Sequence, residues 1–119
     1  MLRLDHVQLA IPKSAEDRCR LFYAGLLGMT EVPKPAALAG RGGLWLESGS
    51  VRIHLGVEED FRPARKAHPA IAVADLDALA RLLSEAGHEP AWDDAIPDIR
   101  RFYVEDPVGN RIEFMKADA

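Results

Sequence analysis

Hydrophobic and polar residues alternate along several short segments of the chain, and this pattern predicts β-strands. Successive side chains of a strand point to opposite faces, so every second residue lies on the same face. The alternation predicts strands at 4–11, 30–32, 44–47, 51–55, 68–73, 90–92, 101–105 and 111–115. Turn residues separate these segments, and the sequence Ser48-Gly49-Ser50 between two of them predicts a hairpin.

Two longer segments carry apolar residues at helical spacing. Residues 14–27 predict the first helix, with Ser14 as its N-cap and Gly28 as its end. The second helix is expected to begin near Asp75, which would be its N-cap, and to end at Gly87. Each half of the chain therefore has a strand, a helix and three further strands, which is the order βαβββ.

The two halves repeat one plan at a nearly constant distance along the chain. His6 and His68 are 62 residues apart, and they fall in the first strand of each half. A repeat of this length indicates duplicated supersecondary units. We therefore predict an α+β fold in which two βαβββ modules form a cupped mixed sheet. One domain is expected over residues 1–119, with module one at 1–57, a linker at 58–66 and module two at 67–119.

Three of the four histidines and one glutamate lie on the strand face opposite the aliphatic residues. These residues are His6, His54, His68 and Glu113. His6 and His68 hold equivalent places in the two first strands, whereas His54 and Glu113 hold equivalent places in the two last strands. Pseudo-twofold symmetry between the modules would gather all four side chains around one point. Imidazole and carboxylate are ligands that Zn, Fe, Mn, Co and Ni accept, so the pattern predicts a divalent-metal site.

The alternation places other polar and aromatic residues on the same face as these histidines. Those predicted to line a substrate site are Gln8, Trp45, Arg101 and Tyr103. Simple packing at a sheet edge is the alternative for the two aromatic residues. Arg52 and Arg111 share the parity as well, at strand ends that water reaches. The linker residues that either are solvated or contact an anionic substrate are Arg62, Arg65 and Lys66.

Two further polar residues are interpreted as structural. His88 follows Ala86 and Gly87 at the end of the second predicted helix, and we interpret it as structural or solvent-facing. Asn110, with Gly109, is of a type that forms turns, so we assign it to the turn between the last two strands.

Four segments of the chain carry a family resemblance. They are Leu4–Val7, Phe22–Met29, Ala67–Val73 and Phe102–Phe114. With these motifs the chain resembles the vicinal oxygen chelate superfamily, which includes glyoxalase I, extradiol dioxygenases and fosfomycin- and bleomycin-resistance proteins. The resemblance implies paired βαβββ modules around a divalent metal, with metal positions at His6, His68 and Glu113. The fourth position, a carboxylate in glyoxalase I, is His54 here, and Gln8 stands where fosfomycin transferases have Thr.

This resemblance implies a metal-dependent enzyme that acts on a small molecule chelating the metal through neighbouring oxygens. Lyase/isomerase and dioxygenase chemistry both fit, with His54 and Glu113 as the expected catalytic residues. His54 is a fourth ligand, a base near the metal or neither of these, and the role of a base is open to it because histidine titrates near neutral pH. The alternative function is a non-catalytic small-molecule or antibiotic-binding resistance protein. Short members of the superfamily commonly pair, so we expect a homodimer with sites shared between chains.

Composition mainly excludes classes of partner. The content of 48% hydrophobic and 29% charged residues is typical of a globular domain. A net charge of -4 gives no electrostatic basis for nucleic-acid binding. No apolar run approaches the roughly 20 residues that cross a bilayer, and the first residues do not resemble a signal peptide. The single Cys19 excludes an internal disulfide, so a cytoplasmic protein is expected.

Overall fold

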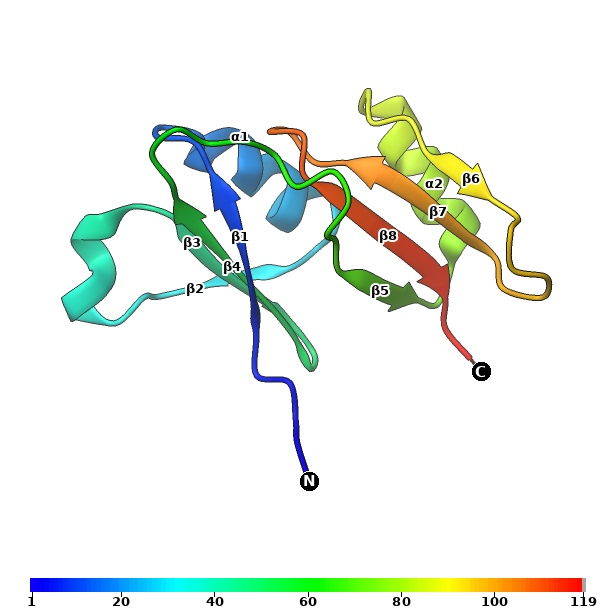
Figure 1. The fold of residues 1–119 in the computed structure, drawn as a ribbon, viewed down its shortest axis with the longest axis horizontal. Coiled ribbons are helices and arrows are strands. Elements are labelled where there is room, and N and C mark those ends of the chain that lie inside the picture. The colour runs from blue at the N-terminus through cyan, green and yellow to red at the C-terminus, as the bar shows by residue number, and fades with distance from the viewer. Residues whose placement is uncertain (119) are drawn as a thin grey trace. The chain divides into compact units, whose positions relative to one another are not determined.

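A computed structural model describes residues 1–118 of the chain. The chain divides into two compact units, Met1–Pro63 and Ala64–Ala119. Each unit contains one four-stranded mixed sheet with a helical segment between its first two strands (Figure 1). The predicted α+β class and the two βαβββ modules are therefore confirmed.

The first unit has the strand order β1-β4-β3-β2. Strands β1 and β4 are parallel, whereas the β3 pairings with β4 and β2 are antiparallel. Its elements are β1 Val7–Ile11, α1 Glu16–Arg20, the π-helix η1 Leu21–Leu26, β2 Thr30–Val32, the 3-10 helix η2 Ala36–Arg41, β3 Leu44–Ser48 and β4 Val51–Val57.

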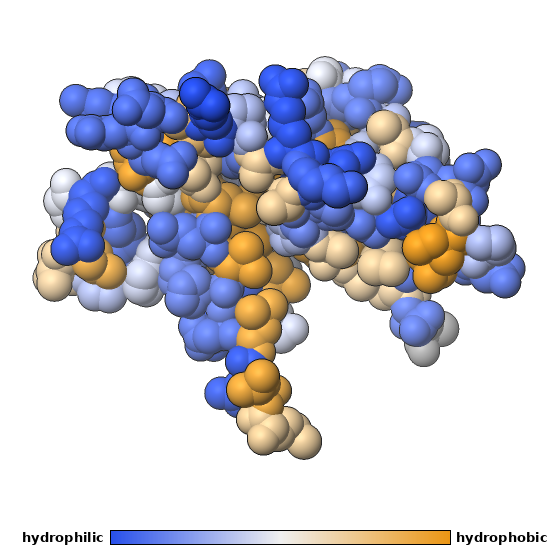
Figure 2. All heavy atoms as spheres, in the orientation of Figure 1, coloured by the Kyte–Doolittle hydropathy of each residue, from blue (hydrophilic) through white to orange (hydrophobic). Residues whose placement is uncertain are grey.

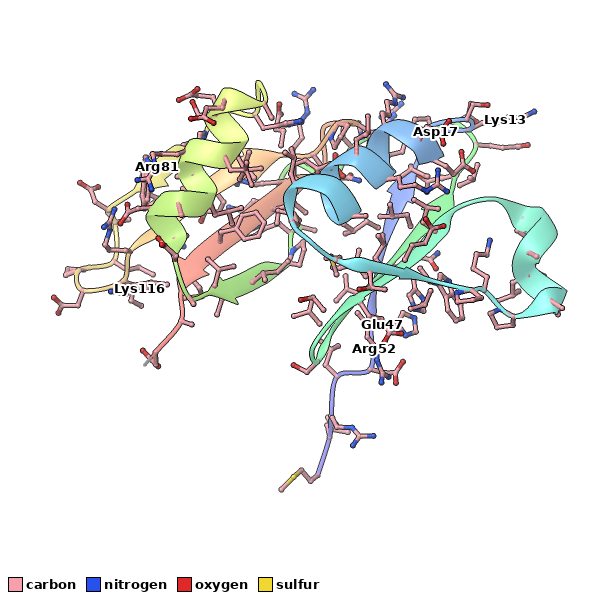
Figure 3. The ribbon with its side chains drawn as sticks, turned by 180° about the vertical axis from the view of Figure 1, so that it is seen from behind. Lys13, Asp17, Glu47, Arg52, Arg81 and Lys116 are labelled. Carbon is pink, nitrogen blue, oxygen red and sulfur yellow. The ribbon has the colours of Figure 1, made fainter. Side chains whose placement is uncertain are left out.

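One face of this first sheet forms the core of the unit. Its buried side chains are Leu9, Ile11, Leu44, Leu46, Ile53 and Leu55. The segment α1–η1 lies along the sheet (Figure 3) and contributes Cys19, Phe22 and Tyr23, each 1% exposed or less. The predicted alternation is confirmed on β3, because Leu44 and Leu46 are buried while Trp45 between them is on the other face.

The first helix differs from its prediction at its start and in its last turns, although it ends just before Gly28 as predicted. Ser14 is not the N-cap, because its φ of 68° is left-handed and Ala15 occupies the cap position without a side-chain hydrogen bond. The Ala15 amide instead donates to the Pro12 carbonyl over 3.3 Å. After Arg20 the helix widens to a π-helix. This wide turn accompanies the burial of two consecutive aromatic residues, Phe22 and Tyr23.

The segment between β2 and β3 is partly helical, and hydrogen bonds connect it to its surroundings. It contains η2, which the sequence did not indicate. The Gly43 amide donates to Glu16 Oε2 over 3.0 Å, and Lys34 donates to the Gly42 carbonyl. Gly43 has a φ of 86°, and a Cβ there would lie 2.0 Å from the Leu55 carbonyl oxygen. Only glycine therefore fits at this position.

The second unit has the equivalent strand order β5-β8-β7-β6, with β5 and β8 parallel. Its elements are β5 Ala70–Val73, α2 Leu76–Glu85, β6 Ala91–Asp93, β7 Arg101–Glu105 and β8 Arg111–Lys116. Asp75 caps α2 as predicted, since its side chain accepts a hydrogen bond from the Ala78 amide over 3.0 Å. The core residues from α2, β7 and β8 are Leu76, Ala80, Leu83, Phe102, Val104, Ile112 and Phe114.

Three strands begin later than predicted. Strand β5 begins at Ala70 rather than at residue 68, and β6 begins at Ala91 rather than at residue 90. In each case the preceding residue is a proline, Pro69 or Pro90, which has no N–H to donate to a ladder. Strand β1 likewise begins at Val7 rather than at residue 4. His6 and His68 therefore lie just before strands rather than within them.

Burial on the edge strand β5 is weaker than predicted. The alternation over residues 68–73 predicts Ile71 and Val73 on the core face, yet both are only half-buried, because β5 has a neighbour on one side only.

Exposed apolar side chains are concentrated before β1. Met1, Leu2 and Leu4 are at least 77% exposed, and the segment at the N-terminus is largely apolar in Figure 2. No helix within residues 1–118 is long and apolar enough to cross a membrane.

Candidate functional site

Three aromatic rings stack on the polar face of the first sheet. The His54 ring, from β4, lies between the other two. Trp45 pairs with His54 in register across β3 and β4, and their ring centroids are 4.0 Å apart at an angle of 6°. On the other side, the His6 ring lies 4.0 Å from His54 at 18°. Residues on the same face of neighbouring strands are close enough for such contact. The alternation of side chains places these three residues on one face, which explains why their rings meet.

His54 is the buried member of this stack, with 7% exposure. Burial lowers the pKa of His54, and the nearby His6 lowers it further, while Asp5 and Glu47 oppose the shift. Glu47 and Arg52 form the adjacent cross-strand pair, and Figure 3 shows them side by side. The imidazole of His54 is therefore held in its neutral form, which can accept a proton.

His6 is oriented by an acidic neighbour. Its Nδ1 donates to Asp5 Oδ2 over 2.9 Å, and Asp5 Oδ1 accepts from Arg52 Nη1 over 3.1 Å. With its Nδ1 occupied, His6 has Nε2 available for a ligand. Gln8 is exposed on the same face. Its side chain lies against Gly56, where a Cβ would be only 2.6 Å from the Gln8 Nε2. Sequence reasoning missed Asp5, although an acid directly before the histidine was visible.

His68 and Glu113 face each other in the second unit. His68 Nε2 lies 2.9 Å from Glu113 Oε1, and His68 Nδ1 lies 2.7 Å from the Lys66 carbonyl oxygen. A carbonyl oxygen only accepts, so Nδ1 carries a proton and donates it. Nε2 then faces a carboxylate oxygen, and the close contact requires a proton or a cation between them. An imidazole whose second nitrogen is held by a backbone carbonyl is the usual arrangement of a metal-binding histidine.

Arg101 holds the other oxygen of Glu113. Its Nη1 lies 3.4 Å from Glu113 Oε2 and donates to the Tyr103 hydroxyl over 3.0 Å, while Nη2 lies 3.3 Å from Asp93 Oδ1. Burial of Arg101 opposes its charge, but the Glu113 hydrogen bond and the charge of Asp93 outweigh burial and raise its pKa. Its Nε is buried without a hydrogen-bond partner among the described residues. Sequence reasoning did not identify Asp93.

Tyr103 contacts the charged and titratable groups of this face. The Arg111 guanidinium carbon lies 3.7 Å from the centre of its ring, and the His68 ring packs edge-on at 5.3 Å. Tyr103 therefore links His68, Arg101 and Arg111 by direct contacts.

The two residues assigned to structural roles have them. Asn110 Oδ1 accepts from the Ala64 amide over 2.9 Å, and the Asn110 amide donates to Asp106 Oδ1 over 2.8 Å, which fixes the turn before β8. His88 Nδ1 hydrogen-bonds the Glu105 carbonyl over 3.1 Å.

The four predicted metal ligands occur as two pairs, one in each unit. Within the part of the chain that the structure describes, no group of three or more His, Cys, Asp or Glu side chains is arranged to hold a metal ion. His68 and Glu113 converge, as two ligands of one ion would. The stacked His6 and His54 rings do not, because nitrogen lone pairs lie in the ring planes and two nearly parallel rings cannot aim them at one point.

Comparison with known proteins decides the family. The glyoxalase-like domain family matches residues 8–115 of the chain. The chain belongs to this family. It is therefore a member of the vicinal oxygen chelate superfamily, as its motifs indicated. The glyoxalase-like chain is 47% identical to a protein of Bacillus anthracis that is assigned to the glyoxalase family, and their structures agree with a TM-score of 0.94 over 99% of this chain and 97% of that one.

More distant structures share the fold of this glyoxalase-like chain. The fosfomycin resistance protein FosX of Listeria monocytogenes is 12% identical, with a TM-score of 0.79 over 99% of this chain and 95% of that one. A glyoxalase/dioxygenase of Nostoc punctiforme is 20% identical, with a TM-score of 0.77 over 98% and 92%. At these identities the similarity establishes the fold alone. No curated protein matches the chain.

Proposed function

We propose that this glyoxalase-like protein is a metal-dependent enzyme whose cation is bound by His68 and Glu113, with His6 as a third ligand. Its substrate is a small molecule that chelates the cation through neighbouring oxygens. The contact between His68 Nε2 and Glu113 Oε1 at 2.9 Å supports the proposal, because these two atoms need a proton or a cation between them and converge as two ligands of one ion would. Divalent Zn, Fe, Mn, Ni and Co all accept this donor set.

The residues around this pair hold it in position. The Lys66 carbonyl orients the His68 ring, and Arg101 binds the Glu113 oxygen that faces away from His68. A cation bound there would act as a Lewis acid and stabilise negative charge that develops on the substrate oxygens. In each of the lyase, isomerase and dioxygenase alternatives, the substrate would first chelate this cation.

We assign His54 the role of a base rather than that of a ligand. Its ring is stacked between His6 and Trp45, so it cannot share an ion with His6 in this arrangement. Its lowered pKa keeps it able to accept a proton at neutral pH. Replacing His54 with Asn should leave metal affinity unchanged and lower turnover by roughly 100-fold, as loss of a general base does. A loss of metal affinity in this variant would instead identify His54 as a ligand.

The third proposed ligand, His6, belongs to the first unit, whereas His68 and Glu113 belong to the second. A site with all three ligands therefore needs residues from a first unit and from a second unit. We propose that a second copy of the chain supplies it, in a homodimer with sites shared between chains. Gln8, Trp45, Arg101 and Tyr103 would then contact the substrate or position the groups that do.

The metal assignment is tested by titrating metal into the metal-free protein, purified without a histidine tag. Glu113→Gln keeps the size of the side chain and removes its charge, so affinity should fall at least about tenfold. Glu105→Gln is the matched control, because it removes the same charge from an exposed position on β7. Equal affinity of Glu113→Gln and the parent protein would refute the assignment.

A non-catalytic small-molecule binder is the second candidate. The stack of His6, His54 and Trp45 supports it, because aromatic rings can bind a planar molecule without a metal. A protein that takes up no metal yet binds planar compounds would establish this alternative. Under either function we place the protein in the cytoplasm, which its single, buried Cys19 fits.

A further inference from the structure

We propose that the second unit contains an anion-binding subsite, formed by Arg111 with Arg65 and Tyr103, beside His68 and Glu113. The substrate would then carry a carboxylate or phosphate group at the end opposite its chelating oxygens. The chelating end rests on the proposed function, whereas the anion subsite stands on separate contacts.

Arg111 is a strand arginine without an acidic partner. Of the three arginines in the described strands, Arg52 pairs with Asp5, and Arg101 pairs with Asp93 and Glu113. No carboxylate among residues 1–118 lies within ion-pair distance of Arg111, whose Nη1 reaches only the Arg65 carbonyl, over 3.4 Å. An unpaired arginine on a partly buried face is a suitable partner for an anion.

Tyr103 holds this arginine in place. The guanidinium carbon of Arg111 lies 3.7 Å from the ring centre. A guanidinium that lies over a ring keeps its N–H groups free at its edge, where they can bind both oxygens of a carboxylate or phosphate. The backbone beneath is fixed as well, because the Arg111 amide donates to the Ala64 carbonyl over 2.9 Å.

A cavity of about 490 Å³ opens at this position, and Arg65, Tyr103 and Arg111 contribute to its wall. Two acids also line it. Glu89 is engaged elsewhere, because its Oε2 accepts from the Ser84 hydroxyl over 3.0 Å. Glu105 lies opposite Arg111 in the strand register and could compete for it. In the structure Arg111 contacts the tyrosine ring and not Glu105, so its positive charge remains available to a ligand.

The strand geometry sets the length of the ligand. Arg111 and Glu113 lie on the same face of β8, two residues apart, which corresponds to about 7 Å along a strand. A molecule that chelates at Glu113 and binds Arg111 would therefore be short, because the two residues lie on neighbouring positions of one strand face. The expected substrate class is therefore a small acid or phosphate ester of about one ring or a short chain, with neighbouring oxygens at the far end.

The test is an NMR titration of the metal-free protein with inorganic phosphate and, separately, with acetate. Signals of the arginine side chains and of Tyr103 should shift in a saturable manner, and the stronger of the two ligands identifies the anion class. Arg111→Met should weaken binding at least about tenfold, because a charge-assisted contact is lost. Arg111→Lys keeps the charge but not the planar fork, so it should bind with intermediate affinity.

Glu105→Gln is the variant that distinguishes this subsite from general surface attraction. It removes the acid opposite Arg111, so phosphate or acetate should bind more tightly to this variant than to the parent protein. Added to Arg111→Met, the same substitution should have no effect on anion binding. Binding that is unchanged in both Arg111 variants, or a parent protein that shows no saturable shift, would overturn the proposal.

Metal titration of the same variants separates this proposal from the proposed function. Arg111 is not a ligand, so Arg111→Met should bind metal like the parent protein. Arginine-dependent anion binding in a protein that takes up no metal would support the subsite and contradict the metal-dependent enzyme. Normal metal binding without any anion binding would contradict the subsite alone.

Discussion

At the scale of single residues, Gly43 joins a loop to the sheet at a position where no side chain fits. Its Cβ would lie 2.0 Å from the Leu55 carbonyl oxygen, and its φ is 86°. Gly43→Ala should lower the free energy of unfolding by about 3 kcal/mol, because conformational strain and a backbone clash add. Chemical denaturation measures this change.

Gly49 is the matched control for this substitution. Its φ is also positive, at 56°, but nothing lies within 4 Å of the position of a Cβ. Gly49→Ala should therefore cost only about 1 kcal/mol, the strain of the left-handed conformation. Equal losses in the two variants would show that the contact with Leu55 has no effect.

Glu16 should make stability depend on pH at the acidic end. Its hydrogen bond from the Gly43 amide holds the pKa of the carboxyl below 4.5, helped by its own backbone amide. The unfolded chain then binds more protons, so this stabilisation is complete above about pH 4.5 and is lost as pH falls through the lower folded pKa. Glu16→Gln should flatten this loss, which we expect to be roughly 1 kcal/mol.

Thermal unfolding between pH 3 and 6, roughly the range in which carboxyls titrate, checks the role of Glu16. Glu85→Gln serves as the matched control, because it makes the same change in an exposed acid on α2. If the Glu16 variant loses stability on acidification as steeply as the parent protein, the hydrogen bond to Gly43 is not the cause.

The sequence indicated the main candidate residues but not the groups that hold them. Parity placed His54 and Trp45 on one face, and it placed Tyr103 and Glu113 on one face of the second sheet. It could not place the Lys66 carbonyl against His68, because a backbone acceptor has no residue type to recognise. Contacts such as that of Asp93 with Arg101 depend on side-chain conformation, which periodicity does not determine.

At the scale of elements, alternation predicted which face each strand buries better than where each strand ends. The buried face of a strand is the one from which water is excluded, and it is recognised from the apolar residues at every second position. Ends depend on hydrogen-bond partners, and Pro69 and Pro90 delay β5 and β6 for this reason. The π-helix η1 and the 3-10 helix η2 were not predicted, because their hydrogen-bond patterns arise from local packing that helical periodicity does not show.

The two predicted helix caps provide an experiment at this scale. Asp75→Ala should lower the free energy of unfolding by about 1 kcal/mol, because the Ala78 amide loses its acceptor, whereas Asp75→Asn should retain most of the stability. Ser14→Ala should change it by less than about 0.5 kcal/mol, since Ser14 caps nothing. A large loss in the Ser14 variant would contradict the observed cap at Ala15.

At the scale of the whole molecule, duplication gives each unit the same topology but a different pair of candidate ligands. If His6 of one chain meets His68 and Glu113 of another, neither His6→Ala nor Glu113→Ala can build a complete site alone. Refolding the two variants together should restore roughly one site in each mixed dimer, because the second site carries both defects.

Metal binding or activity of the mixture, compared with each variant alone, measures the restoration. If every site were built within one chain, mixing would restore nothing. A monomer in sedimentation, or no restoration despite demonstrated subunit exchange, would contradict the shared site.

The two tryptophans lie one in each unit, on strands that are not equivalent, and their surroundings differ. Trp45 is stacked on the His54 imidazole, with the ring centroids 4.0 Å apart. Trp92 is 48% exposed, with the Arg100 guanidinium 4.8 Å from its ring. A Trp92→Phe protein would therefore emit from the first unit only, and a Trp45→Phe protein from the second. The emission wavelength and intensity of the two variants would show whether the two units unfold together or one after the other.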